Sequence, residues 1–136
     1  MRLINLENGK VIADKVELAN SFWKRFRGLM LKGSFWSGQA LVFPFSKPKR
    51  YSIHTFFMRF PIDLLYLDQE LEVIESRKEL SPWKIHKSGE EASILVELPP
   101  GRIEEANVRV DDELDFREKG ESINFCDFSP TLCKGL

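Results

Sequence analysis

The stretch SIHTFFMRFPIDLLYLD, residues 52–68, is the most crowded apolar and aromatic part of the chain, and it decides the fold class. Side chains on a strand alternate between two faces. Both faces are mostly apolar here, so we expect residues 51–60 to form a long central strand. Three ionisable side chains, His54, Arg59 and Asp63, interrupt the apolar residues. They are the first candidates for a site, because a buried charge is costly unless partners compensate it.

Short strands are predicted on both sides of this stretch, because apolar runs of strand length alternate with turn residues. An Asn-Gly pair is typical of a tight hairpin turn, and a proline at a helix start favours one helical turn at residues 99–106. The predicted strands are, in chain order, a hairpin over 2–14 around Asn8-Gly9, then 40–45 with a break at Pro44, 63–68 and 71–77 as a second hairpin, 92–98, 113–118 and 123–128. Residues 46–50 are expected to be a basic loop, and residues 79–91 a polar loop.

One segment follows helical spacing instead. Its apolar residues form a single stripe, which is typical of a helix that packs on a sheet. The stripe consists of Ala19, Phe22, Trp23, Phe26, Leu29 and Met30. The predicted fold class is mostly β (α+β): a compact β-sandwich or partly open barrel of short strands, with one prominent helix packed on it. Residues 1–118 are expected to form a single domain, and residues 119–136 its last strand and a loosely held tail.

Composition excludes several classes of protein. The chain has 136 residues, of which 43% are hydrophobic and 30% charged, as expected for one globular domain. A formal net charge of −1 gives no overall attraction to nucleic acid or to an anionic membrane, so neither is an expected partner. No apolar run is long enough for a signal peptide or a membrane span, and Cys126 and Cys133 form no disulfide framework. We therefore expect a cytoplasmic protein, as a monomer or weak homo-oligomer.

Three ordered blocks of sequence resemble a known family, the domain of unknown function 192. The blocks are RFRGLM, with Arg25, Gly28, Leu29 and Met30 in place; the FFMRFPID stretch, with Phe57, Met58, Pro61 and Asp63; and LVELPPG, with Glu97 and Gly101. The resemblance covers roughly residues 1 to 118. Leu31-Lys32 departs from a common Phe-Arg pair, and Asp111 stands where the family often has Gly.

The resemblance implies a small, mostly β fold with one prominent helix. It implies no biochemical activity, because the family is named for lacking one. Many members look secreted or lipid-anchored, whereas no such leader is expected for this chain. The function must therefore be argued from the residues themselves.

Asp63 allows a structural and a functional interpretation. In the structural one, its carboxylate accepts backbone N–H groups at a strand bend or pairs with Arg25, Arg27 or Arg59. In the functional one, Asp63 is an acid, a base or a ligand anchor in an aromatic-lined pocket, where apolar walls would raise its pKa. The residues expected to line that pocket are Arg25, Arg27, Phe56, Met58, Arg59, Asp63 and Tyr66.

Other candidate residues carry a simpler interpretation beside the functional one. His54 on an apolar strand face is most simply a hydrogen-bonded core histidine, and Met58 a core filler. Glu97 interrupts an apolar strand and could form a pair of carboxylates with Asp63, which would separate their pKa values for acid and base roles. Trp83 is expected to be tucked onto the core because of its large apolar area.

Motifs for other chemistries are missing from the sequence. His54, His86, Asp63 and Glu97 have no metal-ligand spacing, and the two cysteines have the wrong gap for a zinc knuckle, so neither metal nor cofactor is expected. No nucleophile elbow or glycine-rich phosphate loop occurs. Lys47, Lys49 and Arg50, flanked by Phe45 and Tyr51, resemble a small phosphate or nucleic-acid patch. Because the chain is not basic overall, these cations are expected to be solvated instead.

Three hypotheses follow for the function. The leading one is a small β module that binds a small molecule or a protein partner in an aromatic-lined pocket around Asp63. The second is a small hydrolase or isomerase in which Asp63 acts with His54 or Glu97. The third is a purely structural charge network at Asp63, with function on an exposed edge. Whether the protein is an enzyme is left open by the sequence, with binding favoured.

Overall fold

The computed structural model describes residues 1–18, 38–56 and 58–123. Strands dominate this part of the chain, which confirms the mostly β class. The strands are β1 (Arg2–Asn5), β2 (Val11–Ala13), β3 (Lys15–Leu18), β4 (Gln39–Lys49), β5 (Ser52–His54), β6 (Ile62–Leu67), β7 (Val73–Leu80), β8 (Ile85–Lys87), β9 (Ala92–Leu98), β10 (Leu114–Glu118) and β11 (Glu121–Ser122), and the described helix is α2 (Arg102–Glu105). The helix expected over residues 19–30 and the strand expected over 123–128 lie largely or wholly outside the described residues.

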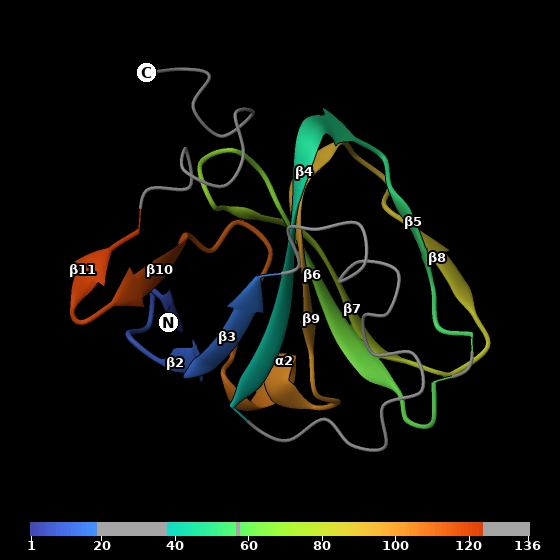
Figure 1. Ribbon diagram of the computed structural model, residues 1–136, viewed down its shortest axis with the longest axis horizontal. Helices are drawn as coiled ribbons and strands as arrows, with labels where there is room; N and C mark the ends of the chain where they lie inside the picture. The colour runs from blue at the N-terminus through green and yellow to red at the C-terminus, as the bar shows by residue number, and fades with distance from the viewer. Residues whose placement is uncertain (19–37, 57, 124–136) are drawn as a thin grey trace.

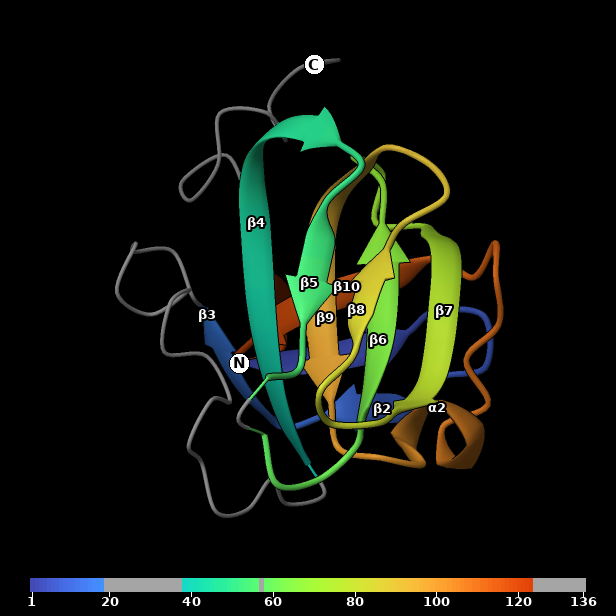
Figure 2. The same cartoon turned by 90° about the vertical axis from the view of Figure 1, so that its right-hand side faces the viewer.

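Three sheets form the described fold (Figure 1). The central sheet has the order β3-β4-β9-β6-β7, a second sheet has the order β11-β10-β1-β2, and β5 pairs only with β8 as a two-stranded ribbon. The second sheet lies on one side of the central sheet and the ribbon on the other (Figures 1 and 2). Every described pairing is antiparallel except that of β3 with β4.

The central strands β6 and β9 are buried along their whole length, because layers cover both of their faces. Alternation therefore sends successive side chains into two different cores. One core lies on the side of α2 and the second sheet and includes Leu65, Leu98 and Ile103. The other lies on the side of the ribbon and includes Phe43, Phe45, Met58, Leu64 and Tyr66.

Several sequence predictions are confirmed. Gly9 has the positive φ of 73° that a tight turn needs, and Asn5 and Lys10 bond across the turn between β1 and β2. Residues 63–68 and 71–77 form the expected hairpin as β6 and β7, and residues 92–98 form β9. The expected helical turn is α2.

Three sequence predictions need correction. Residues 79–91 are not all loop, because β7 extends to Leu80 and Ile85–Lys87 form β8. Residues 51–60 do not form a long central strand: β5 ends at His54 and pairs with β8 in the outer ribbon. The backbone of Thr55 instead bonds to Lys84 and Trp83, which closes the ribbon. Pro44 does not end a strand, because β4 continues to Lys49 and includes most of the expected basic loop. The irregularity follows the proline, as a register shift against β9.

Candidate functional site

Asp63 is buried completely and is hydrogen-bonded to backbone groups. Its Oδ1 accepts the N–H of Glu79 and its Oδ2 accepts the N–H of Ile103, each at 2.9 Å. The first bond holds the end of β7 at Glu79, which has a positive φ of 49°. The second satisfies an N–H in the first turn of α2, whose N-cap, Gly101, has no side chain to offer. Asp63 thus ties β6, β7 and α2 together.

The predicted pocket around Asp63 is not assembled among the described residues. Asp63 is paired with Leu98 on the face of the central sheet that packs against α2. Tyr66 and Met58 lie in the core on the opposite face. Arg59 is exposed. Residues three apart on a strand face opposite ways, which is why Asp63 and Tyr66 do not meet. Arg25 and Arg27 lie outside the described residues.

Glu97 is buried on the ribbon side of the sheet. It lies between Leu41 of β4 and Leu64 of β6, with 9% of its surface exposed. Burial raises the pKa of Glu97 from its ordinary 4.5 to about 8. The predicted pair of carboxylates is therefore corrected, because Asp63 and Glu97 occupy opposite faces.

A series of polar side-chain contacts, formed by Tyr66, His86 and Glu75, connects the central sheet to the ribbon. The Tyr66 hydroxyl lies 2.9 Å from His86 Nδ1, and His86 Nε2 lies 3.4 Å from Glu75 Oε2. The other oxygen of Glu75 accepts the N–H of Gly89 at 2.6 Å. Burial raises the pKa of the Tyr66 phenol above its usual range, and the carboxylates of Glu75 and Glu97 raise it further. These contacts hold the inner face of β8 against β6.

Sequence reasoning considered His86 only as a metal ligand and did not consider Glu75. Alternation along Ile85–Lys87 was the available signal, since it places His86 on the opposite face from its two neighbours. Ile85 is 65% exposed, whereas His86 is partly buried against Tyr66. No local signal identified Tyr66 as its partner.

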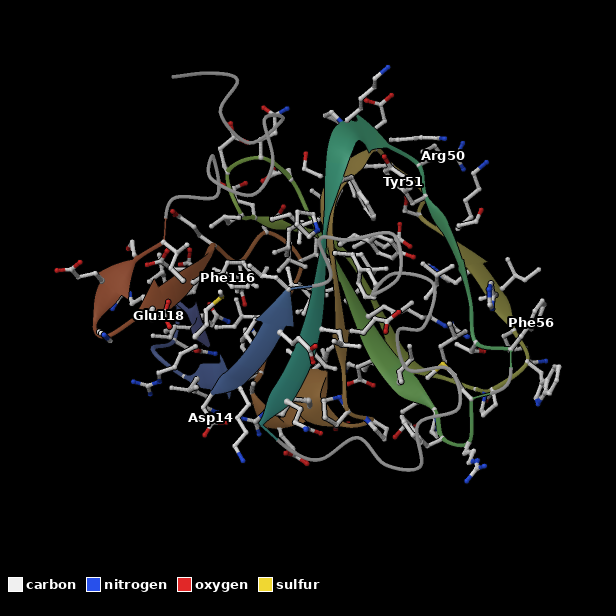
Figure 3. The ribbon with its side chains drawn as sticks, in the orientation of Figure 1. Asp14, Arg50, Tyr51, Phe56, Phe116 and Glu118 are labelled. Atoms are coloured by element: carbon white, nitrogen blue, oxygen red, sulfur yellow. The ribbon has the colours of Figure 1, made fainter. Side chains whose placement is uncertain are left out.

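Three aromatic rings are stacked in a row at one end of the ribbon. The ring centroids of His54 and Phe56 are 4.8 Å apart, and those of Phe56 and Trp83 are 5.9 Å apart, with interplanar angles of 28° in both pairs. Figure 3 shows Phe56 pointing away from the central sheet. His54 is exposed, and Trp83 is 59% exposed. The expectations of a core histidine at His54 and a tucked Trp83 are therefore corrected.

A buried threonine fixes the segment that carries Trp83. The hydroxyl of Thr55 donates to the carbonyl of Ser81 at 2.6 Å and accepts the N–H of Lys84 at 2.9 Å. The backbone N–H of Trp83 donates to the backbone carbonyl of Thr55 at 3.0 Å. Trp83 itself has a φ of 62°, a left-handed conformation that is rare for a bulky side chain. Thr55 thus holds the turn in a strained conformation that places an indole on the surface.

The predicted enzyme groups do not converge. His54 lies on the exposed outer surface of the ribbon, Glu97 in the core beneath the ribbon, and Asp63 on the far side of the central sheet. A catalytic acid–base pair needs two groups within reach of one point on the substrate. The described arrangement does not provide such a point for these three residues.

Two surface hollows lie away from these groups. One, of about 470 Å³, is lined by Arg2, Val11, Ala13, Asp14, Gly38 and Arg102. The Arg102 guanidinium there already donates to the backbone carbonyls of Val11 and Ile12. The other, of about 400 Å³, is formed by residues near β10 and β11. In neither hollow do aromatic walls surround a polar anchor.

Across residues 1–18, 38–56 and 58–123, no group of three or more His, Cys, Asp and Glu side chains is arranged to hold a metal ion. No helix within the same ranges has the length and apolar character needed to cross a bilayer.

Comparison with known proteins assigns the family. The profile of DUF192, described as "Uncharacterized ACR", matches residues 3–116, and the chain belongs to this family. A UPF0127 protein from Thermococcus sibiricus is 36% identical over 119 residues, which cover 88% of this chain and 77% of the relative. A UPF0127 protein from Pyrococcus furiosus is 34% identical over 114 residues, covering 84% of this chain and 97% of the relative.

Solved structures share the fold. A crystal structure of a proposed transcription regulator from Sinorhizobium meliloti 1021 has a TM-score of 0.74 at 24% identity, covering 84% of this chain and 89% of that one. A protein of unknown function from Novosphingobium aromaticivorans has a TM-score of 0.75 at 14% identity, covering 85% and 82%. At these identities the likeness establishes the architecture alone.

Proposed function

We propose that this protein is a binding module whose binding surface is the outer face of the β5–β8 ribbon. The observation that carries the proposal is the stack of His54, Phe56 and Trp83 at the surface. This combines the third hypothesis from the sequence, a structural role for Asp63 with function on an exposed edge, with the expected ligand or partner. The binding surface replaces the pocket expected around Asp63.

Two free-energy costs at Trp83 support a role in binding. Leaving 59% of a Trp side chain in water forgoes roughly 3 kcal/mol of apolar burial. A left-handed backbone at a bulky residue costs about 1–3 kcal/mol more. Strained residues that persist in a fold gather at ligand-binding and active sites. A ligand that stacks on the ring would recover the first of these costs.

The part of the ribbon that carries the three aromatic rings is also held firmly in place. Thr55 fixes the turn, the Tyr66–His86 contact fixes β8, and β5 and β8 pair over three residues in register. Little side-chain and loop entropy remains to be lost when a ligand binds to such a surface, which favours affinity.

Ligand-observed NMR can test the proposal. Saturation transfer would be measured for a panel of sugars, nucleotides, aromatic acids and short peptides, with the wild type and with Trp83→Ala. We expect at least one class of ligand to lose its signal in Trp83→Ala. Leu6→Ala is the matched control, because Leu6 is an exposed apolar residue, 42% accessible, on the loop after β1. If no ligand distinguishes the two variants, the ribbon is not the binding surface.

A further inference from the structure

Charge is distributed unevenly along the chain, although the net charge is only −1. Residues 47–60 and 81–89 contain six Lys and Arg residues and no Asp or Glu. All 21 acidic residues of the protein lie outside these two segments. The two segments are the ones that form the β5–β8 ribbon and its ends. The expectation of no nucleic-acid partner rested on the whole-chain charge, which averages over this difference.

The cationic side chains and the aromatic rings lie on the same β5–β8 ribbon. Ser52 faces Lys87 across the ribbon, and His54 faces Ile85, so these exposed side chains share its outer face. Phe56 and Trp83 extend the outer face at one end, where Lys84 and Arg59 are also exposed.

The other end of the ribbon carries Lys47, Lys49 and Arg50, all exposed. The Arg50 Nε donates to the Ser88 carbonyl at 3.0 Å, and Lys49 Nζ lies 5.5 Å from the centre of the Tyr51 ring. Figure 3 shows Arg50 and Phe56 at opposite ends of β5. The nearby carboxylate of Glu75 is directed to His86 and to the Gly89 N–H.

We propose that this face binds single-stranded nucleic acid, with unpaired bases on the rings of Phe56 and Trp83 and phosphates on the cations at both ends. The inference rests on the proposed function and names the ligand class of the same surface. Stacking on aromatic side chains beside a positively charged track is the general mode of single-strand binding. A duplex hides the faces of its bases, so it offers the rings nothing to stack on.

Charge complementarity favours this ligand over a neutral sugar. Sugar hydroxyls are usually held by several side-chain acceptors and donors, and the outer face offers only Ser52, His54 and Lys87 between the ends. The phosphate backbone of a nucleic acid instead matches the two segments of the ribbon, which contain cations and no carboxylates.

Fluorescence anisotropy with labelled ten-nucleotide oligonucleotides tests the inference. The ligands are single-stranded DNA, single-stranded RNA and a DNA duplex, each at 50 and 200 mM salt. We expect both single strands to bind more tightly than the duplex. Trp83→Ala should weaken single-strand binding about tenfold or more, and Trp83→Phe should restore part of it. The double change Lys84→Glu and Lys87→Glu should weaken binding and flatten its salt dependence.

A matched double variant separates a specific surface from a general charge effect. Lys10→Glu with Lys15→Glu changes the net charge equally, at exposed lysines outside the ribbon. We expect it to bind nearly as the wild type does. An equal loss in both double variants, an unchanged affinity in Trp83→Ala, or duplex binding as tight as single-strand binding would each overturn the inference.

The same variants distinguish this failure from failure of the proposed function. Suppose that no oligonucleotide binds but a sugar, an aromatic acid or a peptide loses its signal in Trp83→Ala. The ribbon is then a binding surface for another class, and only the nucleic-acid inference falls. If no ligand of any class depends on Trp83, both fall. Circular dichroism of each variant establishes that the fold is retained.

Discussion

The two faces of the central sheet each bury one carboxylate, and the two are compensated in opposite ways. Asp63 faces α2, and each of its oxygens accepts a backbone N–H. Glu97 faces the ribbon and is buried between Leu41 and Leu64 of the neighbouring strands. In the register, Asp63 pairs with Leu98 and Glu97 pairs with Leu64, so the two acids are one step apart on neighbouring strands. One step is enough to place them in different cores.

The difference shows that burial alone does not assign a role to a carboxylate. Backbone donors let Asp63 act as a cross-link between three elements, whereas burial raises the pKa of Glu97 to about 8. The face with Asp63 is thus a structural layer. The face with Glu97 supports the ribbon, whose exposed side carries the proposed binding surface. Substitutions on the two faces should separate these roles.

The largest expected effect comes from Asp63→Ala. It leaves the N–H groups of Glu79 and Ile103 without their acceptor, and hydrogen bonds to a charged group contribute roughly 1.5–3 kcal/mol each. We expect the free energy of unfolding, measured in urea, to fall by roughly 3–6 kcal/mol. Asp63→Asn keeps one carbonyl oxygen and should lose about half as much.

Asp115→Ala is the control for this change. Asp115 bonds to Arg117 and Ser122 near the surface of the second sheet, where such pairs contribute about 1 kcal/mol or less. A urea midpoint for Asp63→Asn equal to that of the wild type would show that the Asp63 hydrogen bonds do not stabilise the fold.

The next effect is on the pH dependence of stability, and Glu97 is the cause. Because its pKa is raised on folding from 4.5 to about 8, the folded state binds a proton that the unfolded state releases between these values. Stability should therefore be highest below pH 4.5 with respect to this group, and should fall by roughly 3–5 kcal/mol as the pH rises to 8. Glu97→Gln carries no such proton and should lack this decline.

Urea unfolding of the wild type and Glu97→Gln from pH 5 to pH 9 measures the difference. The two should be nearly equal at pH 5, and the variant should be the more stable one at pH 9. Parallel curves over the whole range would mean that Glu97 stays charged in the folded protein, and the contrast between the two faces would then be lost.

Much of the fold follows from local patterns in the sequence. The polar turn between residues 63–68 and 71–77 predicts the β6–β7 hairpin, and Asn8-Gly9 predicts the β1–β2 turn. Alternation also holds within β9, where Glu97 faces away from Val96 and Leu98. These features depend on residues close in sequence, so one sequence is sufficient to predict them.

The site could not be predicted in the same way. Asp63 and Ile103 are 40 residues apart, and no local pattern indicates that they meet. Alternation alone did exclude a shared pocket for Asp63 and Tyr66, because their spacing is odd. For Trp83, the polar residues of the 79–91 loop gave no period from which to infer a side, and a positive φ at a Trp contradicts local preference.

The smallest of these effects concerns Thr55, which closes the end of the ribbon that carries Phe56 and Trp83. Thr55→Val keeps the shape of the side chain but removes the hydroxyl that bonds to Ser81 and Lys84. We expect a loss of roughly 1–3 kcal/mol in the free energy of unfolding. Thr55→Ser keeps the hydroxyl and should therefore retain most of the wild-type stability. Hydrogen exchange should also accelerate at the amides of Trp83 and Lys84 more than at those of β6 and β9, because the turn would open locally before the sheet does. Uniform acceleration over all strands would instead make Thr55 part of the central core, and the ribbon would no longer be a separately fixed surface.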